Sequence, residues 1–326
     1  MSLNVVRYSY GPVPSRRLGK SLGINNIPAK VCTYSCIYCQ AGRTTQMTVN
    51  RRCFYDPHDI FQDVRKRVEA AKESTEQVDY LTFVPDGEPT LDLNLGKEIM
   101  LLRTLGIPIG VITNGSLVTR DDVREELANA DWVSLKVDAV QDRIWHQINR
   151  PHKTLRLSSI LTGMLQFARS FAGTLVTETM LVNGINDTDD SVNDVAGFLR
   201  RLEPYTAYLS IPIRPPTDRS VRAPDEGTLN RAHQIFAENV QRVEDLVGYE
   251  GESFAFTGDV EKDLLSITAV HPMRQEAVEA FLSRARAPWS VVNRLVAQGH
   301  LVATEYEGHL FYLRKFSQDC GVTTWY

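Results

Sequence analysis

The sequence predicts an α/β protein built around a partial (β/α)6 TIM-like barrel, followed by a small winged-helix-like C-terminal domain. The main observation is a repeated rhythm between about residues 20 and 215, where short β-rich apolar runs alternate with helical stretches, as in parallel βα units. Six runs are present, at residues 21–27, 78–84, 107–113, 132–137, 175–182 and 207–213. A complete eight-unit barrel typically takes about 250 residues, so this shorter block favours an open, partial barrel.

Local signals mark the starts of two helices between these runs. Thr119, with Asp122 three residues later, resembles a capping box, and Thr188 precedes the amphipathic stretch 192–202. The proline-rich stretch 214–225 indicates the exit from the barrel. We therefore expect one domain over residues 1–225, which includes an N-terminal extension.

The rest of the chain, residues 226–326, predicts a helical linker and a compact module. A helix is expected over residues 226–243. Three shorter helices and a hairpin follow, at residues 259–265, 273–285, 290–298, 300–306 and 309–314. This order is typical of a winged helix. Acidic and basic residues are equally numerous after residue 260, which argues against a DNA reader and favours a module that contacts a partner or covers the substrate.

Composition places the chain among ordinary globular proteins. Of its 326 residues 43% are hydrophobic, and the formal net charge is −4. The first residues lack the apolar run of a signal peptide, and no stretch approaches the roughly 20 apolar residues of a membrane span. We expect a cytoplasmic protein without a membrane or DNA partner.

Charge is unevenly distributed along the chain. Residues 1–52 contain eight Arg or Lys and no Asp or Glu, so the remainder of a chain of net charge −4 carries −12. Two interpretations stand side by side: scattered exposed basic residues that offset the charge of a metal cluster, or a basic docking surface around the site.

Three of the five cysteines are clustered as Cys32-x3-Cys36-x2-Cys39, just after the first predicted strand. Such clustering is unlike a secreted disulfide framework and indicates metal ligands in a reducing compartment. Three thiolates can bind three irons of a 4Fe-4S cubane and leave the fourth iron open to a ligand from outside the protein. A structural zinc site normally needs a fourth Cys or His, for which Cys53 and His58 are the next residues along the chain, so zinc stays open on spacing alone.

This spacing, with Tyr38 directly before the third cysteine, resembles the motif of the radical S-adenosylmethionine (SAM) superfamily. The resemblance implies one 4Fe-4S cluster on the three cysteines, SAM as cofactor, and Tyr38 packed against the SAM adenine. It implies reductive cleavage of SAM and hydrogen abstraction from a substrate. It also implies a low-potential electron donor, a ferredoxin or flavodoxin. Because such donors are usually acidic, the basic segment around Arg16 and Arg17 is the expected landing site.

The end of the second predicted strand carries a further match. Residues 84–91 include Gly87 and Glu88 and resemble the Gly-Gly-Glu-Pro motif that binds the SAM amino group, although Asp86 replaces the first glycine. An acceptor-only carboxylate suits an ammonium group. The alternative is a plain turn, which a Gly-Glu-Pro-Thr run also favours.

The next two strands also end in polar residues, as expected where parallel barrels concentrate function. Asn114 resembles a contact on the ribose side of SAM. Ser134, Lys136 and Asp138 alternate along the fourth strand and so share one face, which the resemblance places near the SAM ribose and carboxylate. A structural ion pair between Lys136 and Asp138 is the alternative. Glu178, on the fifth strand, is a further polar candidate.

Residues 10–19 resemble the opening of a radical SAM subgroup similar to the wyosine-type tRNA-modifying Fe-S oxidoreductases. Well-known members of that subgroup bind a second cluster through additional N-terminal cysteines, whereas the first cysteine here is Cys32. Cys53 and Cys320 are interpreted as core or free thiols. Three functions remain open: a radical SAM enzyme acting on an unidentified small molecule, protein or tRNA; a tRNA base-modifying version of it; and a non-catalytic metal-binding interaction protein.

Overall fold

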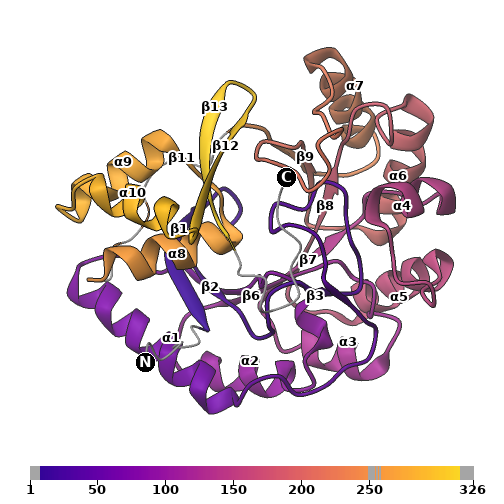
Figure 1. The fold of residues 1–326 in the computed structure, drawn as a ribbon. Coiled ribbons are helices and arrows are strands. Elements are labelled where there is room, and N and C mark those ends of the chain that lie inside the picture. Colours follow the sequence, from indigo (N-terminus) through magenta and orange to yellow (C-terminus); the bar gives the residue numbers. More distant parts are fainter. Residues whose placement is uncertain (1–7, 249–253, 255, 257, 316–326) are drawn as a thin grey trace.

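The centre of the molecule is a curled sheet of eight strands in the order β1-β2-β5-β6-β7-β8-β9-β10, with helices around its outer face (Figure 1). The computed structural model describes residues 8–248, 254, 256 and 258–315. β1 (Ser9–Ser15) pairs antiparallel with β2 (Gly19–Ile24), and all other neighbouring strands are parallel. The partial α/β barrel is confirmed.

All six predicted parallel strands are present. After β2 they are β5 (Tyr80–Phe83), β6 (Ile109–Thr113), β7 (Trp132–Lys136), β8 (Thr174–Met180) and β9 (Thr206–Ser210). The covering helices are α1 (Pro57–Glu73), α2 (Leu95–Arg103), α3 (Asp121–Leu127), α4 (Asp142–Asn149), α5 (Leu157–Ser170), α6 (Asp189–Leu202) and α7 (Glu226–Ala237). A 3-10 turn, η1 (Pro89–Leu91), precedes α2.

Two local predictions about helices were wrong. The helix expected over residues 226–243 ends at Ala237, and β10 (Val243–Leu246) follows and pairs with β9. β10 thus adds a strand to the sheet beyond residue 225, where the domain boundary stays a prediction. Thr119 does not cap α3, which starts at Asp121 after Arg120, whereas Thr188 accepts a hydrogen bond from Ser191 N and caps α6 as expected.

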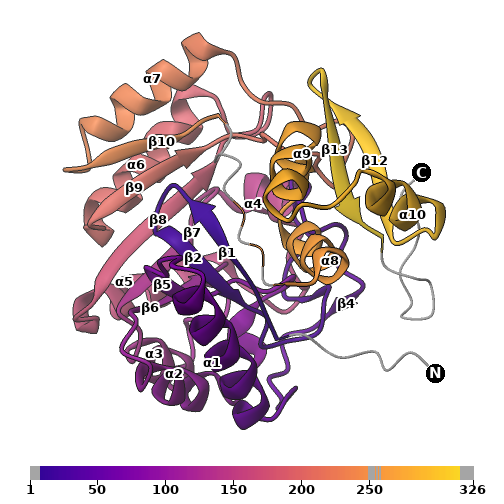
Figure 2. The ribbon, with the colours of Figure 1, turned by 90° about the vertical axis from the view of Figure 1, so that its left-hand side faces the viewer.

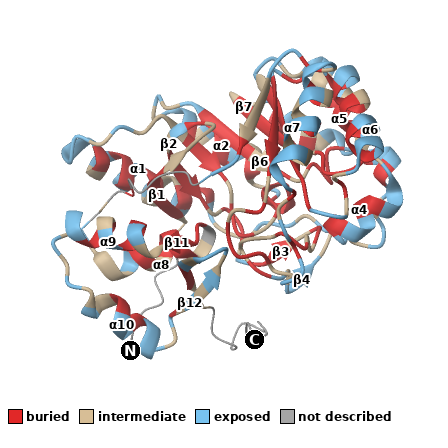
Figure 3. Cartoon of the chain, turned by 90° about the horizontal axis from the view of Figure 1, so that it is seen from above, coloured by how far each residue is buried: buried red, intermediate tan, exposed pale blue. Residues whose placement is uncertain are grey.

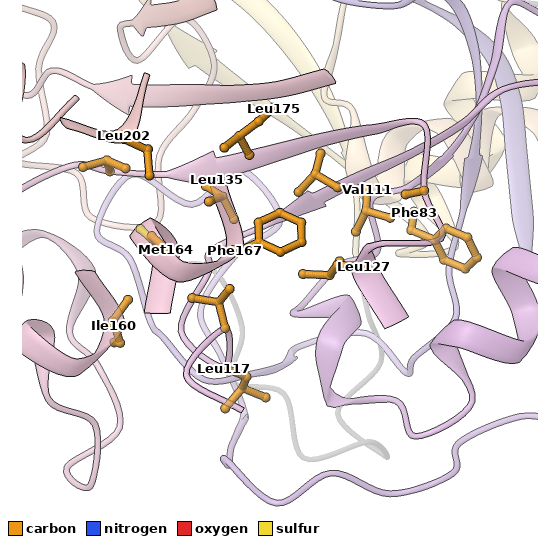
Figure 4. Packing of buried hydrophobic residues seen from close by; sticks show 14 of the residues in the cluster. Phe83, Val111, Leu117, Leu127, Leu135, Ile160, Met164, Phe167, Leu175 and Leu202 are labelled. Carbon is orange, nitrogen blue, oxygen red and sulfur yellow. The ribbon is translucent and has the colours of Figure 1, made fainter. Parts of the chain in front are cut away.

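Alternation along the strands separates an outer core from the barrel interior. Val111, Leu135 and Leu175 pack outward against Phe167 and Met164 of α5 and against neighbouring helices (Figure 4). The opposite faces of the strands point inward. A packed cluster of Leu18, Trp132, Val176, Tyr208 and Leu246 fills part of the interior. Function in parallel barrels concentrates at the ends where the strands finish.

The C-terminal region packs beside β1 (Figure 2). It contains α8 (Val260–Val270), β11 (Met273–Arg274), α9 (Gln275–Arg284), α10 (Ser290–Ala297), β12 (Leu301–Tyr306) and β13 (His309–Arg314). β13 lies between β11 and β12, and Tyr10 and Val13 of β1 belong to the same apolar cluster as this region. The winged-helix-like assignment stays a prediction. Among the described residues, no helix has the length and apolar character needed to cross a membrane.

A buried carboxyl pair beneath η1 makes stability depend on pH. Glu98 of α2 and Asp92 are both almost inaccessible to solvent. Burial, and then the charge of Asp92, raises the pKa of Glu98 to about 9. The folded protein therefore holds a proton on Glu98 that the unfolded chain, with a Glu pKa of about 4.3, has lost at neutral pH. The contribution of Glu98 to stability is complete below its pKa in the unfolded chain. It is lost as the pH rises through its pKa in the folded protein.

We expect Glu98→Gln to flatten the pH dependence of stability. In the wild type the free energy of unfolding should fall between pH 6 and 9 by up to about 1.4 kcal/mol per pH unit from this group, because the unfolded state binds fewer protons. Urea unfolding of the metal-free protein at several pH values measures the slope. The exposed Glu125→Gln on α3 is the control and should keep the wild-type slope. Equal slopes in all three proteins would contradict the prediction.

Candidate functional site

The cysteine loop, residues 32–39, follows β2 and the short strand β3 (Val31–Cys32), and lies against the loop after β5. Two backbone hydrogen bonds join the loops, from Lys30 N to Asp86 O (2.6 Å) and from Glu88 N to Val31 O (3.1 Å). A Cβ added to Gly87 would lie 2.0 Å from Val31 O, far inside van der Waals contact. Gly87 is thus required for this close approach, which ties the cysteine loop to the edge of the barrel.

The three predicted cysteine ligands lie on this loop as partly exposed free thiols. Two of them have an amide donor nearby: Asn114 Nδ2 lies 3.7 Å from Cys32 Sγ, and Asn149 Nδ2 lies 3.4 Å from Cys36 Sγ. Burial raises the pKa of all three thiols, that of Cys36 to about 12. A bound metal ion would favour the ionised form of these thiols.

The donor set fits an iron-sulfur cubane. Among the described residues, no group of three or more His, Cys, Asp or Glu side chains is placed to hold a single metal ion. Thiolates of a cubane bind separate irons and need not converge on one point. The amide groups near Cys32 and Cys36 are suited to hydrogen-bond ligated sulfur.

Glu88 is buried and already well supplied with donors. Its carboxylate accepts hydrogen bonds from Thr90 N (3.1 Å), Thr90 Oγ1 (2.6 Å), Thr113 Oγ1 (2.5 Å) and Asn114 N (2.8 Å). A carboxylate has about four acceptor positions, so these bonds nearly saturate it. In this arrangement Glu88 joins the ends of β5 and β6 and orients Asn114, whose Nδ2 also donates to Thr33 Oγ1 (2.8 Å).

Ser134 and Lys136 of β7, and Asp138 just after the strand, lie on the face opposite Val133, Leu135 and Val137, as alternation predicted. Lys136 Nζ lies 2.8 Å from Glu178 Oε1 and 4.0 Å from Asp138 Oδ1, so its closer partner is Glu178 on the neighbouring strand. Glu178 also pairs with Arg17. The Ser134 hydroxyl is buried and has no hydrogen-bond partner among the described residues. A buried hydroxyl without a partner is costly unless a ligand supplies one.

Asp138 connects β7 to the cysteine loop. Its carboxylate accepts hydrogen bonds from the Tyr38 hydroxyl, from Asn149 Nδ2 (2.7 Å) and from Met180 N (2.8 Å). Lys136 Nζ lies 5.0 Å from the centre of the Tyr38 ring. These contacts fix Tyr38 beside Lys136 and Asp138, although Tyr38 and Asp138 are 100 residues apart in the sequence.

Sequence reasoning missed Asn149, which contacts both the cysteine loop and Asp138. It is the last residue of α4 and is 2% exposed. The available signal was weak: an amide residue at a helix end, two positions before Pro151. A long-range contact places Asn149 at the site: Ser35 N donates to Asn149 O (3.0 Å), and this bond joins the end of α4 to the cysteine loop.

A cavity of about 180 Å³ lies inside the barrel next to the cysteine loop. Residues of the β1–β2 turn, β8, β9 and the C-terminal region line it, among them Arg17, Glu178, Ser210, Arg214 and His271. Gln40, the neighbour of Cys39, also lines the cavity and accepts a hydrogen bond from Arg214 Nη1 (2.8 Å). The cavity has charged walls and borders the predicted cluster site.

Several basic residues of the N-terminal segment lie in the interior, among the residues that the structure describes. Arg16 and Arg17 line the interior cavity, and Arg51 is buried in ion pairs with Asp122 and Glu126. Lys30 is likewise buried, 3.9 Å from an oxygen of Asp86. Arg16 and Arg17 are partly exposed and line the interior cavity, so the landing site expected in the basic segment around them stays a prediction.

Comparison with known proteins identifies the class. Residues 26–199, more than half of the chain, match the model of the radical SAM superfamily, and the chain belongs to that superfamily. It is thus a radical SAM enzyme, a class that uses a 4Fe-4S cluster and SAM. A UPF0026 protein of Methanocaldococcus jannaschii is 47% identical over 97% of this chain and 98% of its own length. The non-catalytic alternative is replaced by this assignment.

Solved structures share the fold at low sequence identity. A radical SAM methyltransferase from Sphaerobacter thermophilus is 16% identical, with a TM-score of 0.53 over 70% of this chain and 67% of its own. TYW1 with a lysine-pyruvate adduct bound is also 16% identical, with a TM-score of 0.53 over 69% of this chain and 76% of its own. Both likenesses concern the fold alone.

Proposed function

We propose that Cys32, Cys36 and Cys39 hold one 4Fe-4S cluster, and that a substrate bound in the adjacent cavity loses a hydrogen atom. When bound, the cluster and SAM supply the reductive cleavage of SAM to methionine and a 5'-deoxyadenosyl radical that removes this hydrogen. The observation that carries the proposal is the placement of three thiols on one loop, two of them beside amide donors, next to a cavity that Gln40 also lines.

Of the residues near the cysteine loop, we expect some to contact SAM directly and others to hold those contact residues in position. Ser134, whose buried hydroxyl has no partner among the described residues, is the best candidate for a direct contact with the SAM ribose or carboxylate. Lys136 and Asp138 share its face, and Tyr38 offers a flat ring for the adenine. Asp138 holds Tyr38 in place through its hydroxyl.

The loop after β5 supplies the other end of the proposed SAM site. The backbone at Gly87 and Glu88 lies against Val31, directly before the cysteine loop, and would hold one end of SAM there. Since the Glu88 carboxylate already accepts four hydrogen bonds, we assign it the role of ordering this backbone for the SAM amino group. Asn114, ordered by Glu88, is placed on the ribose side.

The cavity beside the cluster site is the proposed substrate pocket. Arg17, Glu178 and Arg214 give it charged walls, which suit a polar substrate. A small molecule, or one side chain or base of a larger protein or tRNA, is compatible with its volume. The electron that starts the reaction comes from a low-potential donor of the ferredoxin or flavodoxin type.

Production of 5'-deoxyadenosine tests the proposal. The protein is purified without oxygen, supplied with iron and sulfide, and mixed with SAM and dithionite. We expect a brown protein with four irons per chain, as one cubane requires, and cluster-dependent release of 5'-deoxyadenosine. A colourless protein that binds one zinc and leaves SAM intact would contradict the proposal.

Asp138→Asn should weaken SAM binding while leaving the cluster in place. The amide keeps the size of the carboxylate but has one acceptor oxygen instead of two, so it cannot satisfy Tyr38, Asn149 and Met180 N together. Loss of a supporting contact of this kind typically costs about 10–100-fold in affinity or activity. Equilibrium dialysis with labelled SAM measures the affinity and iron content the cluster. The exposed Asp190→Asn on α6 is the control and should bind SAM as the wild type does.

A further inference from the structure

Three chain segments lie over the outside of the cysteine loop: residues 40–48, 149–153 and 217–222. Each is joined to the loop by hydrogen bonds. The bonds run from Thr44 Oγ1 to Tyr34 O (2.6 Å), Thr48 N to Cys32 O (3.1 Å), Ser35 N to Asn149 O (3.0 Å), His152 N to Thr33 O (2.8 Å), Thr217 Oγ1 to Cys39 O (2.7 Å) and Asp218 N to Ile37 O (2.9 Å). The surface of these segments is therefore the protein surface next to the proposed cluster.

This surface is strongly basic. The exposed charged residues of the three segments form what we name the basic rim: Arg43, Arg150, Lys153, Arg219 and Arg222. The single acidic residue in the segments is Asp218, which pairs with Arg150 (2.9 Å). Figure 3 shows exposed positions on β4 (Gln46–Met47), which lies beside β3. The rim combines contributions from three distant parts of the sequence.

We propose that the basic rim is the docking surface for an acidic one-electron carrier protein of the flavodoxin type. The inference rests on the proposed function, because it takes the cysteine loop as the cluster site. Electron transfer weakens steeply with distance, so a carrier must dock where little protein separates it from the cluster. The rim segments provide that position, since their backbones contact residues 32, 33, 37 and 39 of the loop directly.

The charge of the basic rim would direct an acidic carrier to this part of the surface. The whole chain has a net charge of −4, so an acidic carrier is repelled by much of the surface and attracted to the rim. Such complementary fields accelerate encounter and orient the partner. Met47, 38% exposed in the first segment, adds an apolar contact of the kind that interfaces favour.

Nucleic acid is the competing occupant of a basic surface, and the rim lacks one of its usual features. Proteins that bind single-stranded or looped RNA stack bases on aromatic side chains. The segments 40–48, 149–153 and 217–222 contain no Phe, Tyr or Trp. A small acidic protein is the better match.

Charge reversal at three rim positions tests the proposal. The rim variant is Arg43→Glu, Lys153→Glu and Arg219→Glu, which leaves the Arg150–Asp218 pair intact. The control variant is Lys66→Glu, Lys97→Glu and Arg169→Glu, with the same change of net charge at exposed positions of α1, α2 and α5. Flavin fluorescence anisotropy gives the affinity of each full-length protein for oxidised flavodoxin at low and at high salt. Stopped-flow absorbance gives the rate of cluster reduction by reduced flavodoxin and by dithionite.

We expect the rim variant to bind flavodoxin at least about ten-fold more weakly than wild type at low salt, and to be reduced by it correspondingly more slowly. High salt should remove most of the difference, because exposed charges are screened beyond about 10 Å at 0.1 M salt. Reduction by dithionite should be equal in the wild type, the rim variant and the control variant, since a small reductant needs no docking surface.

Several results would overturn the proposal. It fails if the wild type does not bind flavodoxin at low salt, or if the rim and control variants lose affinity equally. It also fails if the rim variant keeps its affinity for flavodoxin but no longer binds transfer RNA, because the rim would then be a nucleic-acid surface. A wild type that dithionite cannot reduce would contradict the proposed function instead, while the binding of oxidised flavodoxin would still decide the role of the rim.

Discussion

Cys36→Ala is expected to abolish both the cluster and 5'-deoxyadenosine formation. The substitution leaves one iron of the cubane without a protein ligand, and no replacement thiol lies at the site among the residues that the structure describes. Among the described residues, the cysteine outside the loop is Cys53, which is exposed and lies 3.7 Å from Asn94 Oδ1. Iron and sulfide content, the visible absorption of the reconstituted protein and the deoxyadenosine assay measure the loss.

Cys53→Ala is the matched control for this experiment. It removes a thiol of the same chain without touching the loop, and we expect normal iron content and normal SAM cleavage. Cys320 lies outside the described residues, so the variant at Cys53 is the better-defined comparison. A Cys36→Ala protein that retains a full cluster and activity would remove Cys36 from the ligand set.

Gly87→Ala should be the most damaging substitution that adds a single methyl group. The new Cβ would lie 2.0 Å from Val31 O and 2.8 Å from Ile27 Cδ1. Two of the atoms it meets belong to the Val31 backbone, so the cysteine loop and the loop after β5 must separate. Overpacking of this kind costs about 1–3 kcal/mol, and more where the neighbour is rigid. We expect lower stability in urea together with poor iron uptake.

Gly197→Ala separates this steric effect from the general effect of replacing glycine. Gly197 lies within α6, and a Cβ there would meet no atom within 4 Å. Alanine in a helix interior is favoured over glycine by about 1 kcal/mol. This variant should be as stable as the wild type or more stable, with full iron uptake. Equal behaviour of the two alanine variants would refute the steric argument at Gly87.

Much of the fold followed from the sequence because strands alternate locally. Each of the six predicted parallel strands was found, and the inward face of β7 was assigned correctly from the order of its residues. The edges of the sheet were harder to predict. β1 contains Pro12 and Pro14, which weaken a strand prediction, and its pairing with β2 makes it an antiparallel edge strand. β10 is four residues long and includes Glu244 and Asp245, so it lacks a strong apolar pattern.

In the candidate site, too, the contacts between neighbouring residues were easier to predict than the contacts between distant segments. The alternative interpretation of Lys136 was an ion pair with Asp138, two residues away, but its shorter contact is with Glu178 on the next strand. Asn149 was missed because its partners Cys36, Tyr38 and Asp138 lie on other elements. The charge count of residues 1–52 was correct, but burial removed Lys30 and Arg51 from the surface and turned Arg17 into the barrel.

The sequence by itself determined the cysteine spacing, the six parallel strands and the polar ends of the strands, because each depends on residues that are neighbours along the chain. Only the tertiary structure decided that Glu88 is saturated by hydrogen bonds and that Gly87 must lack a side chain. It also decided that the basic surface next to the cysteines comes from residues 40–48, 149–153 and 217–222. The physical reason is that burial and charge pairing depend on which distant segments the folded barrel brings into contact.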